Sequence, residues 1–259
     1  MIKVNAIPAF KDNYIWLIET SGHCYIIDPG DNLVVHQWLQ KHDKTLSAIL
    51  VTHHHNDHIG GINGLLDHYP IPVYGPDSHY IPQITHPLKD GDCLSLPGLY
   101  LQVMAIPGHT MDHIAYFAEN KEQAPMLFCG DTLFAGGCGR IFDGTAGLLH
   151  QSLERLSQLP SSTQVFCAHE YTLDNLRFAQ AVEPENKILK QRAIIEREKR
   201  SLGHATVPTT IANERATNPF LRCQVDSVRK KVGMHYNTEV SSTVEVFTLL
   251  RQWKDNFNL

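Results

Sequence analysis

The sequence predicts an α/β protein, in which a layered domain of strands and helices precedes a domain made of helices alone. Apolar and β-branched runs bounded by Gly, Pro, Asn and Asp are typical of strands, and they fill the first two thirds of the chain. Helical patterns lie between some of these runs, an alternation typical of a layered α/β domain. After about residue 170 helical patterns dominate. These observations predict the fold class.

The expected elements follow from local patterns. The strands are predicted over residues 15–20, 24–28, 48–52, 100–106, 113–118, 126–130 and 164–168. The helices are predicted over residues 33–42, 61–69 and 148–159, and then over residues 172–182, 186–202 and 242–257. The helix over 186–202 is expected to begin after Pro184 and to end at Gly203. We therefore predict domains of residues 1–170 and 171–259.

Composition limits the classes of function. The 259 residues are 42% hydrophobic and 19% charged, with a net charge of −5, so no basic surplus indicates nucleic-acid binding. No apolar run approaches the roughly 20 residues that span a bilayer, and no secretory signal is recognisable at the N-terminus. The six cysteines form no CxxC pair and several lie in apolar runs. We therefore expect buried free thiols in a cytoplasmic protein rather than a disulfide framework.

The stretch THHHNDHIGG, residues 52–61, carries the strongest chemical signal. A strand is expected directly before it and a helix directly after it. Side chains at i and i+2 on extended backbone point the same way, so His53 and His55 can converge on one metal ion. Asp57 and His58 fall at the turn into the helix and can serve a second ion. His54 is expected to point elsewhere. A solvated histidine-rich loop is the alternative.

Three later motifs share one context, a polar residue just beyond an apolar strand. PGHT offers His109, CGDT offers Asp131 and CAHE offers His169. Open α/β sheets place sites at strand ends, and a catalytic zinc takes three protein ligands and one solvent position. The predicted ligands are His53, His55 and His109 for one ion, Asp57, His58 and His169 for the other, and Asp131 as the bridge. Taken alone, Asp131 could be a turn residue or a helix cap. The remaining histidines, His113 among them, are expected to be structural or exposed.

These motifs resemble those of the metallo-β-lactamase superfamily. THHHNDH resembles its THxHxDH signature, and PGHT, GDT and AHE match its later ligand motifs in order. The resemblance covers roughly residues 1–170. It implies a four-layer αββα sandwich with a dinuclear metal site at one edge, followed here by the C-terminal α-helical domain.

Further segments resemble the glyoxalase II, or hydroxyacylglutathione hydrolase, family nearly from end to end. They are DNYIW (12–16), IDPGD (27–31), LFCGDTLFAGGCGR (127–140), DGTA (143–146), CAHEYT (167–172), NPFLR (218–222) and LRQWKDNF (250–257). The resemblance implies that the C-terminal helices help to hold glutathione. The positions that match its substrate contacts are Arg140, Phe142, Tyr171, Arg251 and Lys254. Some members carry tyrosine in place of Phe142 and lysine in place of Arg140, so one tyrosine hydroxyl contact is absent here.

The residue types agree with that implication. Glutathione carries two carboxylates, which accept charge-assisted hydrogen bonds from Arg and Lys. Arg251 and Lys254 are three positions apart on an expected helix and therefore share a face. The alternative is that both are solvated surface cations.

The resemblance implies an enzyme that hydrolyses S-(2-hydroxyacyl)glutathione, such as S-D-lactoylglutathione, to glutathione and a 2-hydroxy acid, the second step of methylglyoxal detoxification. Two divalent ions about 3.5–4 Å apart would share a water, whose hydroxide form attacks the thioester carbonyl. Zinc is expected, although His and Asp also suit iron and manganese. Asp131 is expected to bridge the ions. A thiol pKa of about 8.5 makes thiolate a good leaving group.

Three alternatives are weighed. A glutathione-persulfide dioxygenase holds a single iron through two histidines and an aspartate, and the residues Asp57, His58 and His169 disfavour it because they complete a second site. The negative net charge disfavours a nuclease. The presence of every candidate ligand disfavours a non-enzymatic metal-binding protein. The expected partner is a small-molecule glutathione thioester bound to a monomer, with no nucleic acid and no membrane.

Overall fold

The first of two six-stranded sheets comes from the N-terminal part of the chain. In the computed structural model, which describes residues 2–119 and 123–257, its strands lie side by side in chain order. They are β1 (Lys3–Ala9), β2 (Asn13–Glu19), β3 (Cys24–Ile27), β4 (Leu46–Leu50), β5 (Val73–Pro76) and β6 (His86–Leu88). The pairs β1–β2 and β2–β3 are antiparallel, and the pairs from β3 to β6 are parallel. The THHHNDH stretch follows the end of β4.

The second sheet contains the strands that precede the other candidate ligands. Its strands are β14 (Thr209–Thr210), β13 (Gln164–Phe166), β10 (Met126–Phe128), β9 (Ile114–Ala118), β8 (Leu99–Ala105) and β7 (Cys93–Leu96), in that spatial order. Only the β10–β13 pair is parallel. A short ribbon of β11 (Leu133–Phe134) and β12 (Gly137–Cys138) follows β10. Because β10 and β13 run the same way, their carboxyl ends bring CGDT and CAHE to one edge.

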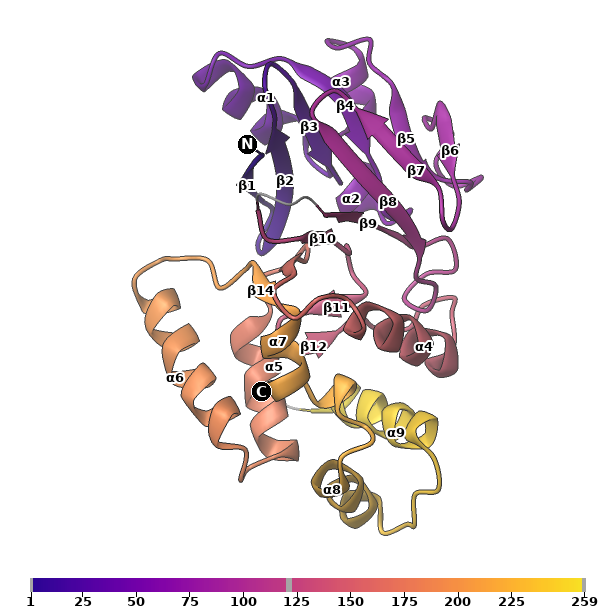
Figure 1. Ribbon diagram of the computed structural model, residues 1–259, viewed down its shortest axis with the longest axis vertical. Coiled ribbons are helices and arrows are strands. Elements are labelled where there is room, and N and C mark those ends of the chain that lie inside the picture. The colour runs from indigo at the N-terminus through magenta and orange to yellow at the C-terminus, as the bar shows by residue number, and fades with distance from the viewer. Residues whose placement is uncertain (1, 120–122, 258–259) are drawn as a thin grey trace.

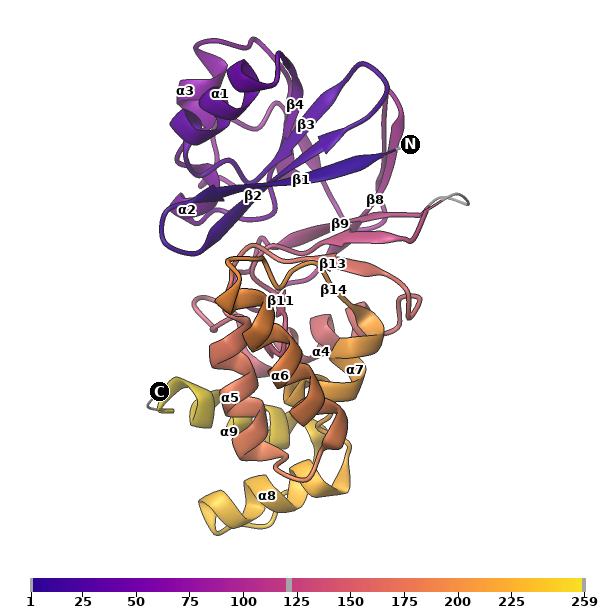
Figure 2. The ribbon, with the colours of Figure 1, turned by 90° about the vertical axis from the view of Figure 1, so that its left-hand side faces the viewer.

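Alternating side chains of β2 face two different cores of the sandwich. Trp16 and Ile18 of β2 join the core shared with the second sheet, which includes Leu101. Ile15 and Leu17, on the opposite face of the same strand, pack in the core under α1 (Asn32–Lys41) and α3 (Ile62–Leu66). On the far side of the second sheet, α4 (Ala146–Ser157) adds its apolar face. The layers are thus α, β, β and α, and the predicted αββα sandwich is confirmed (Figure 2).

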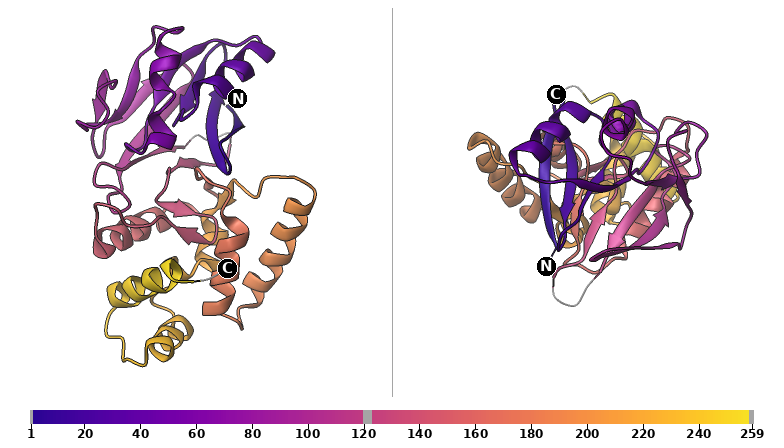
Figure 3. Two further views of the ribbon diagram at one scale, coloured as in Figure 1. Left: turned by 180° about the vertical axis from the view of Figure 1, so that it is seen from behind. Right: turned by 90° about the horizontal axis from the view of Figure 1, so that it is seen from above.

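Helices make up most of the C-terminal part of the chain (Figure 1). They are α5 (Thr172–Val182), α6 (Lys187–Ser201), α7 (Ile211–Thr217), α8 (Asp226–Tyr236) and α9 (Thr243–Asp255), with a short 3-10 turn at Pro219–Leu221. The view from behind places the yellow α9 at the opposite end of the molecule from the indigo strands of the first sheet (Figure 3). The predicted helices over 172–182, 186–202 and 242–257 are confirmed to within two residues at each end. The boundary between residues 170 and 171 stays a prediction, and β14 of the helical part joins the second sheet beside β13.

Two expectations need correction. The helix predicted over 61–69 ends earlier, as α3, and a separate short helix α2 (Asn56–Ile59) precedes it. Asp57 and His58 therefore lie inside α2 rather than at the turn into a longer helix. By contrast, the six cysteines are free, as predicted, and only Cys93 is exposed. Within the described ranges, no helix is long and apolar enough to cross a membrane.

Candidate metal centre and substrate pocket

The ends of four strands meet at one edge of the sandwich. THHHNDH follows β4, His109 follows β8, Asp131 follows β10 and His169 follows β13. Their ligand atoms form the groups His53–His55–His109–Asp131 and Asp57–His58–His169, within each of which the atoms lie no more than 4.8 Å apart. The structure thus brings the residues of each predicted ligand set together, and Asp28, His53 and His58 form a third such group. Residues up to 116 positions apart in the chain are thus brought to one place by the sheets.

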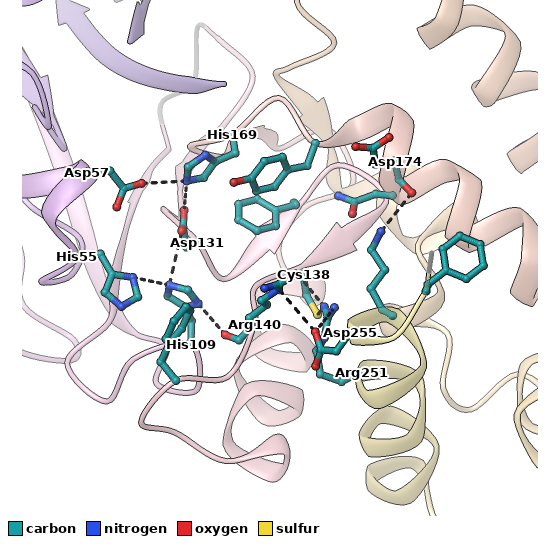
Figure 4. A pocket seen from close by; sticks show the side chains of 16 residues that line it. His55, Asp57, His109, Asp131, Cys138, Arg140, His169, Asp174, Arg251 and Asp255 are labelled. Carbon is teal, nitrogen blue, oxygen red and sulfur yellow. Dashed lines mark hydrogen bonds and ion pairs between the residues drawn. The ribbon is translucent and has the colours of Figure 1, made fainter. Parts of the chain in front are cut away.

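Individual distances show how closely the side chains approach. His55 Nδ1 lies 3.0 Å from His109 Nε2 in the first group. In the second group, His169 Nε2 lies 3.5 Å from Asp57 Oδ2. Figure 4 shows both contacts, with His109 on one side of Asp131 and His169 on the other.

Asp131 lies between the two groups. Its Oδ1 is 3.4 Å from His58 Nε2 and 3.3 Å from His169 Nε2. Its Oδ2 is 3.6 Å from His109 Nε2. One carboxylate oxygen thus faces each group, which is the arrangement that a bridging ligand requires.

The donor atoms fit divalent metal ions. His53 Nε2, His58 Nε2 and Asp131 Oδ1 are buried and have no hydrogen-bond partner among the described residues. Buried polar atoms almost always have a partner, so these three atoms point to a ligand. Burial and then the neighbouring His58 hold the pKa of His53 well below its usual range, which keeps the ring neutral. Neutral imidazole and carboxylate are the donors that bind such ions.

Carboxylates and carbonyls orient the histidines through the ring nitrogen that faces away from the centre. His58 Nδ1 lies 3.0 Å from Asp28 Oδ2, and His169 Nδ1 lies 2.9 Å from Asp12 Oδ1. His109 Nδ1 lies 2.7 Å from the carbonyl oxygen of Arg140. Such partners fix the tautomer and the ring orientation of histidine ligands. Sequence reasoning missed the roles of Asp12 and Asp28, although both lie in the segments DNYIW and IDPGD.

His113 has a structural role, as expected, and it lies directly behind the centre. Its buried ring stacks on His53 with centroids 4.4 Å apart. Its Nε2 accepts the backbone N–H of Asp131 at 3.1 Å. Burial, followed by the nearby His109, lowers the pKa of His113 to about 3, so the ring stays neutral and able to accept. His113 therefore supports both His53 and Asp131 without lying in either ligand group.

His54 points away from the centre, as predicted. Its Nδ1 lies 2.9 Å from Asp112 Oδ1, and its ring packs on Tyr80 at 4.5 Å between centroids. It is absent from the groups of potential ligands among the described residues. The extended backbone therefore alternates its histidines, with His53 and His55 inward and His54 outward.

The turn into Asp131 requires glycine. Gly130 has a φ of +46°, and a Cβ there would lie 2.5 Å from Thr52 Oγ1. A side chain would meet both unfavourable backbone geometry and a steric clash. The glycine of CGDT thus lets the chain turn tightly enough to aim the aspartate at both groups.

A cavity of about 520 Å³ leads away from the metal centre. Its lining includes every residue that matches a substrate contact in the family, namely Arg140, Phe142, Tyr171, Arg251 and Lys254. The ligand residues His55, Asp57, His109, Asp131 and His169 form its other end. Figure 4 shows the cavity running from these ligands toward the last turn of α9. One elongated ligand could therefore reach both ends.

Aromatic rings flank the metal end of the cavity. Tyr171 stacks on His169, with ring centroids 4.7 Å apart and an angle of 5° between the planes. Phe142 packs edge-on against His55 at 4.7 Å and His109 at 5.1 Å, and 64% of it is exposed. Both rings therefore lie where they can contact a ligand beside the ions.

The cations occupy the other end. Arg140 is 73% exposed, whereas Arg251 is only 5% exposed and donates to the carbonyl oxygen of Cys138 at 3.0 Å. Lys254 Nζ donates to the carbonyl oxygen of Asp174 at 3.3 Å. Burial, followed by the charge of Arg251, lowers the pKa of Lys254. Neither Arg251 nor Lys254 is a freely solvated surface cation.

Two protein families together match nearly the whole length of the sequence. Residues 10–169 match the Metallo-beta-lactamase superfamily, and residues 170–257 match the family described as Hydroxyacylglutathione hydrolase C-terminus. A hydroxyacylglutathione hydrolase from Pseudomonas paraeruginosa is 48% identical over 99% of this chain and 100% of its own length. One from Nitrosomonas europaea is also 48% identical, over 99% of this chain and 97% of its own.

Solved structures share the fold. ETHE1 from Myxococcus xanthus has a TM-score of 0.66 and 25% identity, covering 100% of this chain and 92% of its own. TTHA1623 in a di-iron-bound form has a TM-score of 0.54 and 29% identity, covering 64% of this chain and 91% of its own. With the end-to-end relatives and the ligand groups described above, these findings show that the chain belongs to the hydroxyacylglutathione hydrolase family of the metallo-β-lactamase superfamily.

Proposed function

We propose that this protein is a thioester hydrolase that converts S-(2-hydroxyacyl)glutathione, such as S-D-lactoylglutathione, to glutathione and a 2-hydroxy acid. The observation that carries the proposal is one cavity with a group of metal ligands at one end and three cations at the other. A glutathione thioester has matching parts, a reactive carbonyl at one end and a carboxylate at the other. The full-length relatives named hydroxyacylglutathione hydrolase support the same activity.

We further propose two ions in each chain, most simply zinc. His53, His55 and His109 would hold one ion, Asp57, His58 and His169 the other, and Asp131 both. Bound divalent ions lower the pKa of water toward about 7 and polarise a carbonyl, which is the chemistry that hydrolysis of a thioester needs. Iron and manganese suit the same donors, and a related structure is a di-iron form.

The chain's own residues would bind and orient the substrate. Arg140, Arg251 and Lys254 present cations to the carboxylate of the glycine end of glutathione. Tyr171 and Phe142 flank the thioester, because each ring packs against a ligand histidine. Sulfur can leave as thiolate without a strong acid, since thiols have a pKa of about 8.5. Phe142 lacks the hydroxyl that some members carry at this position, so the backbone of glutathione loses one polar contact here.

The oligomeric state and the location in the cell are proposals too. A monomer suffices, because every proposed ligand and substrate contact comes from one chain. A cytoplasmic location suits a protein in which five of the six free cysteines are buried.

A panel of substrates tests the activity. Thiol release from S-lactoylglutathione should exceed release from the lactoyl thioester of a small neutral thiol by at least about tenfold in kcat/KM, a difference of about 1.4 kcal/mol. Replacing two of the three cations, with Arg251→Ala and Lys254→Ala, should raise KM for the glutathione thioester far more than KM for the neutral thioester. Oxygen uptake with glutathione persulfide, in place of thiol release, would favour the dioxygenase alternative. Metal binding without turnover of any thioester would favour the non-enzymatic one.

A further inference from the structure

A carboxylate of the protein itself lies between two of the cavity's cations. Asp255 Oδ1 accepts from Arg251 Nη2 at 3.0 Å and lies 3.8 Å from Arg140 Nε. Asp255 is at the end of α9 and lines the cavity. Figure 4 shows it between the two guanidinium groups. The same oxygen therefore faces both arginines that are expected to meet the substrate's carboxylate.

The hydrogen bonds of Arg251 leave little room for another acceptor. Its Nη1 donates to the Cys138 carbonyl at 3.0 Å, and its Nη2 donates to Asp255. Its Nε is buried and has no hydrogen-bond partner in the part of the chain that the structure describes. A second carboxylate can pair with the outer edge of this guanidinium only if Asp255 moves aside.

Asp255 can move more easily than Arg251. Its side chain is 41% exposed, against 5% for Arg251, and it is the last residue of α9. Arg251 is held from behind by Cys138 and by the ring of Phe220, whose centroid is 5.1 Å from its guanidinium carbon. The arginine is therefore fixed, and the carboxylate in front of it is the exchangeable partner.

The positions of the charged side chains at this end of the cavity also single out Asp255 as the residue that a ligand's carboxylate would displace. Arg140, Arg251 and Lys254 supply three positive charges at this end of the cavity, and the side chains of Asp174 and Asp255 supply two negative ones. Asp174 lies beside Arg177, 3.7 Å away, rather than between the arginines. Within residues 2–119 and 123–257, only Asp255 contacts both guanidinium groups, where a ligand's carboxylate would meet them.

We propose that Asp255 is a built-in competitor for the glycine carboxylate of the glutathione moiety. It holds Arg140 and Arg251 in the free protein, and the ligand exchanges with it on binding. This inference rests on the proposed function for the identity of the ligand. The competition weakens binding of substrate and of product glutathione alike, and it thereby speeds release of the product.

Substitution of the carboxylate by its amide tests the exchange. Asp255→Asn keeps the shape of the side chain and removes its charge. It should lower KM for S-lactoylglutathione and Kd for glutathione by about threefold to tenfold. This range corresponds to the loss of an ion pair that is exposed to partly buried. With the glycine carboxylate of either ligand converted to an amide, the variant and the wild type should bind alike.

Asp174→Asn is the matched control. It changes the charge of the cavity by the same amount and leaves the contacts of Asp255 with both arginines in place. Its effect on Kd for glutathione should be less than about twofold. An equal gain in affinity for glutathione in both variants would overturn the proposal, because the total charge of the cavity would then explain the effect. Weaker glutathione binding in Asp255→Asn would overturn it too, because Asp255 would then position Arg251 for the ligand.

The thioester hydrolase activity and the competition by Asp255 can be disproved separately. If the wild type hydrolyses no glutathione thioester, the proposed function fails, while calorimetry with glutathione still decides the role of Asp255. If the wild type hydrolyses S-lactoylglutathione but Asp255→Asn binds glutathione no more tightly, only the competition is wrong.

Discussion

Asp28 and His58 form a buried pair behind the metal centre, with Asp28 Oδ2 3.0 Å from His58 Nδ1. Asp28 also accepts from the backbone N–H and the hydroxyl of Thr52, each at 2.7 Å. Its φ is +52°, a left-handed conformation that Asp and Asn tolerate better than most residues. One carboxylate thus connects the end of β3, the end of β4 and helix α2. The centre depends on this connection for the direction of His58 Nε2.

The pair predicts that Asp28→Asn weakens metal binding. Asparagine suits the left-handed backbone but offers one acceptor oxygen for three donors, so His58 loses its orientation. Affinity for the ion at Asp57, His58 and His169 should fall about 10–100-fold, as is usual when such a partner is lost. Metal content after dialysis against a weak chelator measures the change. Asp31→Asn is the control, because Asp31 only caps α1 and asparagine caps equally well; equal metal loss in both variants would contradict the prediction.

The outward direction of His54 predicts a contrast between neighbours. His54→Gln should leave the metal content unchanged, because its ring contacts Asp112 and Tyr80 instead of the centre. His55→Gln should lose the ion bound with His53 and His109, because a ligand of that group is removed. Elemental analysis of the two purified variants makes the comparison. Similar metal loss in both would mean that the alternation of the extended backbone does not determine the ligands.

A buried ion pair predicts where a substitution in the helical part lowers the stability most. Arg192 Nη2 lies 2.6 Å from Glu214 Oε1, with side chains 6% and 0% exposed. Glu214 Oε2 also accepts the backbone N–H of Gly136, beside the β11–β12 ribbon. Glu214→Ala should lower the free energy of unfolding by about 3–5 kcal/mol, because it leaves a buried guanidinium unpaired.

Urea unfolding of the metal-loaded proteins measures that loss. Lys190→Ala is the control, since Lys190 lies 3.9 Å from the exposed Glu185 and should cost no more than about 0.5 kcal/mol. A loss in Glu214→Ala as small as in the control would show that the pair does not stabilise the fold.

The lowered pKa of Lys254 predicts a pH dependence of binding. Burial and then Arg251 lower it below the 10.5 of an ordinary lysine, so the ammonium loses its proton at a lower pH than an exposed lysine does. Attraction for the ligand's carboxylate is therefore present below this pKa and is lost as the pH rises through it. As the pH rises on the alkaline side, Kd for S-methylglutathione should increase at a lower pH than an ordinary lysine would give, and more steeply than in Lys254→Arg, since arginine stays charged. The ligand's amine titrates equally in both proteins, so parallel curves would contradict the prediction.

The ligand motifs could be predicted because each is local. A polar residue directly after an apolar strand is visible in a few consecutive letters, and the alternation of His53, His54 and His55 follows from extended backbone. The partners Asp12 and Asp28 could not be found in this way. They contact His169 and His58 across 157 and 30 positions, and only the assembled sheets bring them together.

The elements that were missed are weakly patterned. β6 reads HPL, and β12 has two residues, so neither shows an alternation of apolar and polar positions. Helix α8 buries only Val228 and Val232. In α6 the aliphatic residues Ile188, Ile194 and Ile195 are exposed, while the buried face uses Leu189, Arg192, Ala193 and Glu196. The isoleucines of this helix are therefore not on the face that packs.

Turnover measured together with metal content tests the central claim most directly. Purified protein should release thiol from S-lactoylglutathione and contain two divalent ions per chain. Removing the ions with a chelator should abolish the activity, and zinc, iron or manganese should restore it. Full thiol release from metal-free protein would contradict the account.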